Sequence, residues 1–332
     1  MRQLPKTFTG PGLIDIQVNG YAGLSFNDDP ADWTVEQFRR VSSMLWSRGI
    51  AAALATLITS DSEAMVARAE RYRQIVESDE ELCQRFPKLH IEGPFISPSD
   101  GPRGAHSKQY CRLPAGMPDL IERLRQASGD RIAIVTLAPE LPGAIELIGQ
   151  LADSGICPAI GHTQASAGAI DEAISAGARI STHLGNGTHL ELPRLENYVQ
   201  SQLAADRLAA SFIPDGHHMP FTTLKNFIRA KTPGRSILVS DAISATEMGP
   251  GEYSLGRGKV VVLESGRCVV PGEGHLSGST LTLDVGVINT FRHCGVGFDQ
   301  AWAMASANPA GVVGLPVPQE VTVRVSRDGF KQ

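Results

Sequence analysis

Residues 156–186, with the sequence ICPAIGHTQASAGAIDEAISAGARISTHLGN, decide the fold of this chain. They predict a short apolar strand ending at Gly161-His162-Thr163, an alanine-rich helix, and a second strand ending at Thr182-His183. Parallel strands that are joined by a helix and pair as neighbours lie about 4.8 Å apart. Both imidazoles would then lie on one rim of a sheet, within reach of one metal ion. Two unrelated polar residues at strand ends would give the same pattern.

The composition excludes several classes of partner. The chain has 332 residues, a hydrophobic content of 42% and a formal net charge of −5, with a sequence pI near 6.0. A chain of this length can bury a large core, either as one barrel or as two ordinary domains. The acidic balance argues against nucleic acid or an anionic membrane as the main partner. A small anionic substrate stays compatible with it, because a few local cations decide such binding.

The cysteines and the apolar segments indicate the cellular compartment. The five cysteines are scattered, form no C-x-x-C pair and suit a reducing environment: Cys83, Cys111, Cys157, Cys268 and Cys294. Residues 1–20 lack the layout of a signal peptide. The longest apolar run, Ile50–Ile58, has about half of the ~20 residues that a membrane-spanning helix needs. We therefore expect a soluble, cytoplasmic protein.

Strand patterns and helix patterns alternate along the whole chain. We count eight strand-then-helix units, with strands expected at residues 13–20, 50–58, 88–92, 131–137, 156–160, 178–183, 207–213 and 236–240. Helix starts carry capping boxes such as Thr34-Val35-Glu36-Gln37. Short apolar strands that are buried on both faces indicate a parallel sheet closed into a TIM-type (β/α)8 barrel. An open, doubly wound sheet is the alternative, but no G-x-G-x-x-G motif follows any strand.

The remaining segments fit around one barrel domain. We expect a lead-in at residues 1–10, the barrel at residues 11–315, and a tail at residues 316–332 with one short strand. Alternating valines predict a β-like insert at residues 251–274, after the eighth strand.

Polar residues suited to chemistry fall at the carboxyl ends of the predicted strands: Gln17, Asn19, Glu92, His162, His183, His218 and Asp241. Barrel enzymes carry their catalytic groups on that rim. Glu92, His162 and His183 supply one carboxylate and two imidazoles, the donor set of a hydrolytic zinc site. Asp241 then suits proton transfer to and from the reacting groups.

Two structural alternatives remain for these positions. Asp241 could be the N-cap of a following helix. The first strand, which places Asp15, Gln17 and Asn19 on one face, could be a solvated edge strand.

Seven motifs occur in a characteristic order: His90-Ile91-Glu92-Gly93-Pro94-Phe95, Gly161-His162-Thr163, Thr182-His183-Leu184-Gly185-Asn186, Pro214-Asp215-Gly216-His217-His218, Val239-Ser240-Asp241-Ala242, Leu276-Ser277-Gly278-Ser279 and Asn308-Pro309-Ala310. In this order they resemble the N-acetylglucosamine-6-phosphate deacetylases of the amidohydrolase superfamily. The resemblance spans residues 11–315 and implies a metal-dependent enzyme that removes acetate from N-acetylglucosamine 6-phosphate.

The resemblance also implies the metal site. Glu92, His162 and His183 would hold one divalent ion, zinc, and Asp241 would act as general base and general acid. Many amidohydrolases carry H-x-H on the first strand and bind a second metal. This chain has Gln17-Val18-Asn19 there, as in the single-metal branch of the family, and neutral amides bind a dication poorly compared with imidazole.

For substrate binding, the resemblance implies contacts to the sugar phosphate, assigned by spacing to Asn186, Gly187, Arg194 and His218. It also implies that His106 contacts the sugar hydroxyls and that Ser277 lines the acetyl pocket. Arg194 suits a phosphate because its planar fork donates bidentate hydrogen bonds. Residues 192–196, however, read Leu-Pro-Arg-Leu-Glu where many members have His-Arg-Glu-Pro-Gly. A surface Arg194 that pairs with Glu191 or Glu196 is therefore the alternative.

Several functional alternatives stay open from the sequence. The substrate could be a different or unphosphorylated N-acetyl hexosamine, or a cyclic amide. A barrel that binds sugar phosphate without catalysis, or a structural protein, would belong to another class. The short chain ends predict that the β-sandwich of the family is missing or vestigial, and a homodimer of the family type stays an open expectation.

Overall fold

The computed structural model describes residues 2–255, 258–272 and 276–332. Eight parallel strands form one sheet in the order β11-β10-β9-β8-β7-β6-β5-β2. The strands are β2 Leu13–Val18, β5 Ile50–Ile58, β6 Leu89–Glu92, β7 Ile132–Leu137, β8 Cys157–Ile160, β9 Ile180–Ser181, β10 Ala209–Phe212 and β11 Ser236–Leu238. They match the eight expected strands, so the prediction of a TIM-type barrel is confirmed.

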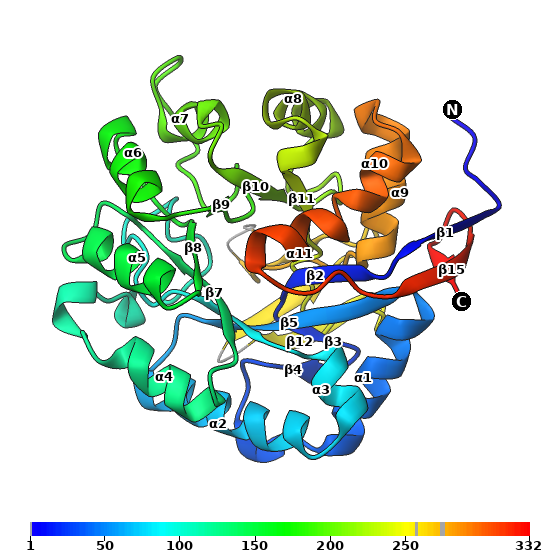
Figure 1. Ribbon diagram of the computed structural model, residues 1–332, viewed down its shortest axis with the longest axis horizontal. Helices are drawn as coiled ribbons and strands as arrows, with labels where there is room; N and C mark the ends of the chain where they lie inside the picture. Colours follow the sequence, from blue (N-terminus) through cyan, green and yellow to red (C-terminus); the bar gives the residue numbers. More distant parts are fainter. Residues whose placement is uncertain (1, 256–257, 273–275) are drawn as a thin grey trace.

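Helices surround the strands (Figure 1). They are α1 Val35–Ser47, α2 Ser62–Glu77, α3 Glu80–Arg85, α4 Leu120–Ser128, α5 Ala144–Asp153, α6 Ala167–Ala176, α7 Tyr198–Ala204, α8 Phe221–Lys231, α9 Leu283–Cys294, α10 Phe298–Ala303 and α11 Ala307–Val313. The capping box of Thr34 and Gln37 forms at α1 as expected. The helices α3 and α11, with six and seven residues, were not expected because so short a segment shows little helical periodicity. Within the described ranges, no helix has the length and apolar character needed to cross a membrane.

The seam between β2 and β11 is closed by residues from beyond the eighth strand. An isolated bridge joins Val18 to Ala242 at the carboxyl end of the seam. Nearer its amino end, the Ile14 amide donates to the Ala305 carbonyl and the Leu238 amide to the Met304 carbonyl, both at 2.8 Å. Helix α11 lies over this end of the barrel (Figure 1) and packs side chains into its interior. The barrel is thus closed only with the help of the last helices.

The barrel interior changes from apolar to polar along the strands. An apolar cluster fills the part of the interior nearer the amino ends of the strands and includes Leu54, Ile134, Ile180, Ala209 and Ile237. Two residues further along their strands, on the same face, lie buried polar side chains: Thr56 on β5, Thr136 on β7, Thr182 after β9 and Ser211 on β10. This polar layer lies directly beneath the rim where the expected site residues are found.

Three smaller sheets accompany the barrel in the described residues. Strands β1 Thr7–Pro11, β15 Glu320–Val325 and β16 Phe330–Lys331 form one antiparallel sheet near both termini (Figure 1). Residues 1–10, expected as a lead-in, therefore contain part of a strand that pairs with the tail, and five residues were too few to show a clear alternation. The short sheet β3 Gly20–Tyr21 and β4 Leu24–Ser25 follows β2.

The expected insert after the eighth strand is an antiparallel sheet. It consists of β12 Gly251–Leu255, β13 Gly258–Val262 and β14 Cys268–Val269. Residues 256–257, 273 and 274 of the predicted insert lie outside the described residues.

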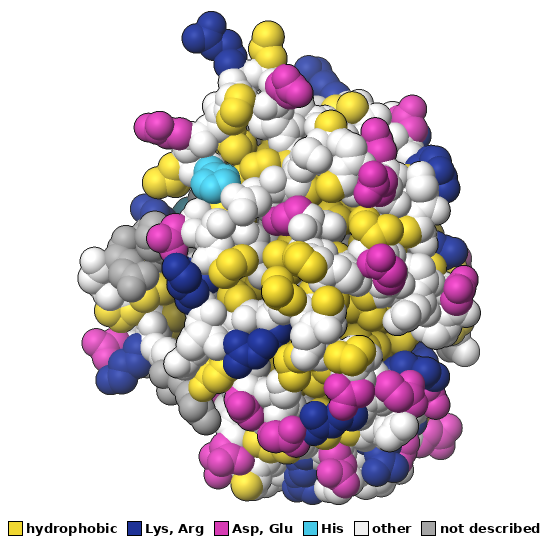
Figure 2. All heavy atoms as spheres, turned by 90° about the vertical axis from the view of Figure 1, so that its left-hand side faces the viewer, with side chains coloured by type: hydrophobic (Ala, Val, Ile, Leu, Met, Phe, Trp, Pro, Cys, Tyr) yellow, Lys and Arg dark blue, Asp and Glu magenta, His cyan; other side chains and the backbone are white. Residues whose placement is uncertain are grey.

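Elsewhere on the molecule, acidic and basic side chains are interspersed over the face shown in Figure 2. That mixed face agrees with the small net charge.

Candidate active site

Four of the expected site residues lie at strand ends on the carboxyl rim. Glu92 is the last residue of β6, and His162 and His183 each come two residues after β8 and β9. Asp241 comes three residues after β11. All four are buried, with exposed fractions of 2%, 6%, 4% and 8% respectively. The structure thus brings these side chains together at one end of the barrel.

The backbone is strained at three of these positions. His162, His183 and Asp241 have φ angles of +51°, +29° and +51°, in the left-handed region that side chains other than glycine rarely adopt. Such a conformation costs of order 1–3 kcal/mol and persists only where the surroundings enforce it. At His183, the backbone amide donates to Ser211 Oγ at 2.7 Å. Strain of this kind concentrates at functional sites.

One oxygen of Glu92 is the centre of the cluster. Glu92 Oε1 lies 3.2 Å from His162 Nε2 and 3.0 Å from His183 Nε2. It also accepts a hydrogen bond from Gln17 Nε2 at 3.0 Å. Burial opposes ionisation of this carboxyl, but the contacts with His162 and His183 hold the pKa of Glu92 well below its usual range. The cluster therefore presents a carboxylate, and three nitrogens from three other strands converge on it.

The donor set of this cluster fits a divalent metal ion. His162 Nδ1 lies 2.9 Å from the Pro102 carbonyl oxygen, which can only accept a hydrogen bond. The proton is therefore assigned to Nδ1, and in the neutral ring Nε2 carries a lone pair. That lone pair is directed at the Glu92 carboxylate, so the contact is favourable only where a proton or a metal ion lies between the two atoms. Metal-binding histidines usually donate their other ring N–H to a carbonyl in this way.

His106 is part of the same cluster, although we expected it to contact sugar hydroxyls. Its Nε2 lies 3.2 Å from His162 Nε2, and the two rings meet edge to face with centroids 4.3 Å apart. Glu92, His106 and His162 each place a donor atom within 4.8 Å of the other two. Burial and the neighbouring His162 lower the pKa of His106 to about 3, so this ring is neutral. Two overlapping donor sets therefore exist, one that includes His183 and one that includes His106.

Asp241 faces this cluster from the seam of the barrel. Its Oδ1 accepts a hydrogen bond from Asn19 Nδ2 at 2.7 Å. Burial and the negative charge of Glu92 raise the pKa of Asp241 to about 6. In the described part of the chain, the next helix after Asp241 is α9 at Leu283, so the helix-cap alternative is wrong. Because every residue of β2 is buried, the alternative of a solvated edge strand is wrong as well.

Three of the residues expected to bind substrate lie close to the cluster. Asn186 donates to the His183 carbonyl at 3.1 Å. Gly187 approaches His162 so closely that a Cβ on it would lie 2.6 Å from His162 Nδ1, and its φ of +58° also favours glycine. Ser277 is buried in a segment whose Ser279 amide donates to the Asp241 carbonyl at 2.9 Å. These residues surround the rim as the sequence motifs suggested.

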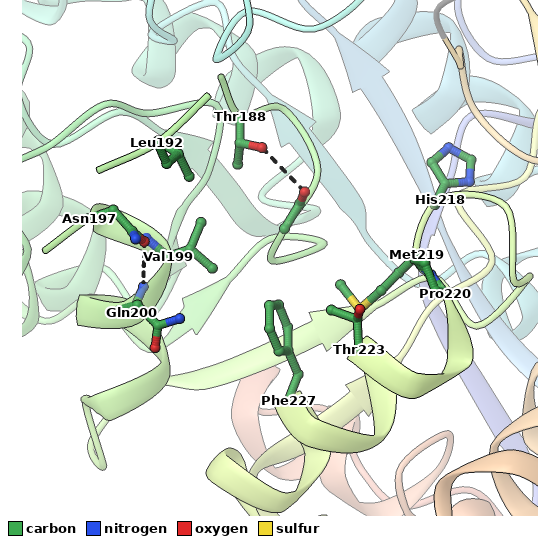
Figure 3. Close-up of a pocket in the computed structure, with 11 residues that line it drawn as sticks. Thr188, Leu192, Asn197, Val199, Gln200, His218, Met219, Pro220, Thr223 and Phe227 are labelled. Atoms are coloured by element: carbon green, nitrogen blue, oxygen red, sulfur yellow. Dashed lines mark hydrogen bonds between the residues drawn. The ribbon is translucent and has the colours of Figure 1, made fainter. Parts of the chain in front are cut away.

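His218 lines a cavity of about 290 Å³, and Arg194 lies in a loop that borders it. His218 lies at one end of this cavity, opposite Asn197 and Gln200 (Figure 3). Its Nδ1 donates to Asp215 at 2.7 Å. Arg194 is exposed, and among the described residues it makes no ion pair with Glu191 or Glu196. The loop of Arg194, residues 187–197, borders the cavity through Thr188, Leu192 and Asn197.

Sequence reasoning missed two groups that hold the cluster in place. The Pro102 carbonyl fixes the ring of His162, and Ser211 Oγ fixes the backbone of His183. Pro102 lies in a loop without any periodic signal. Ser211 did carry one, because it is a lone polar residue in the buried strand β10.

Asp15 is a further buried carboxyl beneath the rim. Its Oδ1 accepts from the Ser240 amide at 3.2 Å and from the Gln17 amide at 3.4 Å. Burial raises the pKa of Asp15 to about 7, although the hydrogen bonds with Ser240 and Gln17 work in the opposite direction.

Comparisons with known proteins identify relatives over almost the whole chain, although no protein-family model matches it. N-acetylglucosamine-6-phosphate deacetylase from Homo sapiens is 33% identical over 318 residues, which cover 92% of this chain and 74% of the human protein. N-acetylgalactosamine-6-phosphate deacetylase from Shewanella sp. (strain ANA-3) is 33% identical over 313 residues, with coverage of 92% and 74%. A mutant N-acetyl-D-glucosamine-6-phosphate deacetylase from Mycobacterium smegmatis, solved in complex with N-acetyl-D-glucosamine-6-phosphate, superposes with a TM-score of 0.86 at 27% identity and covers 98% of this chain and 87% of that chain.

A buried carboxylate among imidazoles, on the rim of a TIM-type barrel with these relatives, defines a metal-dependent hydrolase of the amidohydrolase superfamily. Proteins of this class work with a divalent metal ion. Within the class, the chain belongs to the N-acetylglucosamine-6-phosphate deacetylase family. The resemblance found in the sequence motifs is thereby confirmed.

We predict that the buried Asp15 makes stability depend on pH. Its pKa is higher in the folded chain, about 7, than the ordinary value of 3.8 for an aspartate, so the folded state binds the proton more tightly. The stabilisation is complete below pH 4 and is lost as pH rises through 7. Asp15→Asn keeps an acceptor oxygen but no charge. It should flatten this dependence and raise stability at pH 8 by at most about 4 kcal/mol. Urea unfolding of both proteins between pH 4 and pH 8 measures the difference, and parallel pH profiles would contradict the assignment.

Proposed function

We propose that this chain hydrolyses the acetamide of N-acetylglucosamine 6-phosphate to glucosamine 6-phosphate and acetate. The observation that carries the proposal is the Glu92 oxygen facing two imidazole nitrogens at 3.0–3.2 Å, with Asp241 beside them. The relatives from Homo sapiens and Mycobacterium smegmatis support the substrate, because their names or complexes contain this sugar phosphate.

We assign Glu92, His162 and His183 as the ligands of one zinc ion. One carboxylate and two imidazoles leave an open coordination position, the pattern of catalytic rather than structural zinc sites. When bound, the ion supplies Lewis-acid polarisation of a carbonyl oxygen and lowers the pKa of a water molecule. Gln17 and Asn19 serve as donors to Glu92 and Asp241 in place of a second metal site, since both side-chain amides point N–H groups at these carboxylates.

Asp241 is the proton-transfer group in this proposal. It takes a proton from the attacking water and returns it to the nitrogen that leaves as the amine, so that one water is consumed and acetate is released. Asn19 donates to Oδ1 of Asp241 at 2.7 Å, and no hydrogen bond within the described residues engages the other oxygen, which is available for this exchange. Burial keeps bulk water away from the reacting proton.

Substrate binding follows the residues assigned from the sequence. His106, buried against His162, is placed to meet the sugar hydroxyls, and Ser277 lines the acetyl pocket. Asn186 and Gly187 present their backbone beside His162, while His218 and Arg194 supply the phosphate contacts around the cavity of about 290 Å³. An exposed guanidinium without an ion-pair partner in the described structure is available for a phosphate.

A second candidate substrate is N-acetylgalactosamine 6-phosphate. The Shewanella relative is named for that epimer and shares 33% identity with this chain. The two sugars differ only in the orientation of one hydroxyl group, so the same acetamide chemistry serves both.

Assembly and location complete the proposal. The barrel at residues 11–315 acts as the catalytic domain, with residues 1–10 and 316–332 as its flanks. A homodimer is part of the proposal, and the side chains of Leu190 and Leu195, which are 95% and 82% exposed, are apolar groups that a second chain could cover. The free cysteines support a cytoplasmic location.

The two overlapping donor sets predict different effects of histidine variants on the metal. We expect His183→Asn to weaken the affinity for zinc by more than about 100-fold, the largest loss typical of outer-shell partners. His106→Asn should keep zinc and instead raise KM. Mass spectrometry for metals after dialysis against a weak chelator measures the content, and the exposed His217→Asn is the control. Loss of zinc from His106→Asn with retention in His183→Asn would replace His183 by His106 in the ligand set.

Asp241→Asn should separate metal binding from turnover. The variant keeps an oxygen for the hydrogen bond but cannot accept the proton, so we expect kcat to fall about 10²–10⁴-fold. The zinc content should stay that of the unaltered protein. Acetate release and metal content are measured on the same preparation, and a fully active Asp241→Asn enzyme would refute the assigned role.

Matched substrates test the phosphate contact. We expect Arg194→Ala to lower kcat/KM for N-acetylglucosamine 6-phosphate by roughly 10- to 100-fold, the equivalent of one charge-assisted hydrogen bond. Turnover of unphosphorylated N-acetylglucosamine should not change. Glu196→Gln, in the same loop, is the control. The galactosamine epimer and a cyclic imide, assayed in parallel, decide among the alternative substrates.

A further inference from the structure

A chain of hydrogen bonds crosses the barrel directly beneath the proposed metal site. Thr182 Oγ1 lies 2.7 Å from Thr136 Oγ1, and Thr136 Oγ1 lies 2.7 Å from His90 Nε2. His90 Nδ1 lies 3.0 Å from the Ile16 carbonyl oxygen. The exposed fractions of Thr182, Thr136 and His90 are 4%, 0% and 2%. We call Thr182, Thr136 and His90 the interior relay.

The direction of every hydrogen bond in the interior relay is determined. The Ile16 carbonyl can only accept, so the proton of the neutral His90 ring is on Nδ1. His90 Nε2 must then accept from the Thr136 hydroxyl. Since the Thr136 proton is used in that bond, Thr182 donates to Thr136. No member can reverse its role without breaking the sequence of bonds.

Gly161 makes the link between the two threonines possible. Thr136 is on β7 and Thr182 follows β9, and the chain that continues β8 passes between them at Gly161. A Cβ at Gly161 would lie 2.6 Å from Thr136 Cγ2 and 3.0 Å from Thr182 Cβ. The absence of a side chain at this position therefore lets the hydroxyls meet across the middle strand.

Two members of the interior relay, and two residues in contact with it, adjoin groups of the proposed site. Thr182 directly precedes His183, and Gly161 directly precedes His162. His90 lies two residues before Glu92 on the same face of β6. Ile16 directly precedes Gln17, which donates to Glu92. The relay thus connects β2, β6, β7 and the ends of β8 and β9 at the level from which all these side chains project.

We propose that the interior relay is a positioning device that fixes the spacing of the Glu92, His162 and His183 donors. The inference rests on the proposed metal site. A purely structural role would not require polar groups here, because a buried hydrogen bond contributes little net stability compared with apolar residues of the same shape. Hydrogen bonds fix the relative positions of the groups that they join. The donor atoms of a metal site need such supporting hydrogen bonds around them to keep their spacing.

Thr136→Val tests the proposal, because valine has the same shape and lacks the hydroxyl. We expect zinc to bind about 10-fold more weakly, in the range found for outer-shell partners. The absorption spectrum of the Co²⁺-substituted protein, which reports ligand geometry, should change. Thr136→Ser restores the hydroxyl and should restore both the affinity and the spectrum. Thr290→Val, at an equally buried threonine of α9, is the control and should change neither.

Gly161→Ala is a second test that leaves all hydroxyls in place. It should separate Thr136 from Thr182 and weaken zinc binding as Thr136→Val does, while Thr182→Val gives the same loss. Unaltered zinc affinity and an unaltered Co²⁺ spectrum in Thr136→Val would overturn the interior relay and leave the proposed function intact. If the unaltered protein itself bound no divalent ion, the proposed function would fail first.

Discussion

The rim of this barrel depends on the buried oxygen of one carboxylate. A charge taken out of water is costly unless it is paired and hydrogen-bonded. Glu92 Oε1 meets this requirement with contacts to Gln17, His162 and His183. These partners come from three other strands, at separations of 70 to 91 residues along the chain. Their convergence requires the whole barrel to be folded, so the fold and the candidate site form together.

The need to bring partners to the Glu92 carboxylate explains why the backbone is strained at the strand ends, at a cost in folding stability. His162, His183 and Asp241 each adopt a left-handed backbone conformation that an unconstrained chain would avoid. At His162 and His183 the turn aims the side chain inward, whereas regular alternation would have placed His162 on the outward face with Ile160 and His183 on that of Ser181. The apolar layers below, around Leu54 and Ile237, supply the packing that enforces these turns.

Much of this arrangement could be predicted because strand ends in parallel sheets share one rim. The spacing of His162 and His183 around one helix already places both imidazoles there, and the order of motifs identified the family. Other features had no local signal. The role of the Pro102 carbonyl depends on how a long loop folds back, and β1 pairs with β15 across more than 300 residues. The contact of His106 with His162 could not be predicted either, because His106 lies in a loop without a periodic pattern. Arg194 lies in a loop whose sequence departs from the family, so its partner could not be inferred.

The way in which the barrel closes gives the two parts of the rim different backbone contacts. Glu92, His162 and His183 lie at the ends of β6, β8 and β9 within a continuous ladder, whereas Asp241 stands at the seam, beside the bridge that joins Ala242 to Val18. The Asn19 backbone amide donates to the Ala242 carbonyl at 2.7 Å, so the backbone next to Asp241 is attached to β2. The proposed metal ligands and the proposed acid therefore have separate backbone supports: the continuous ladder for the ligands, and the bridge between Ala242 and Val18 for the acid.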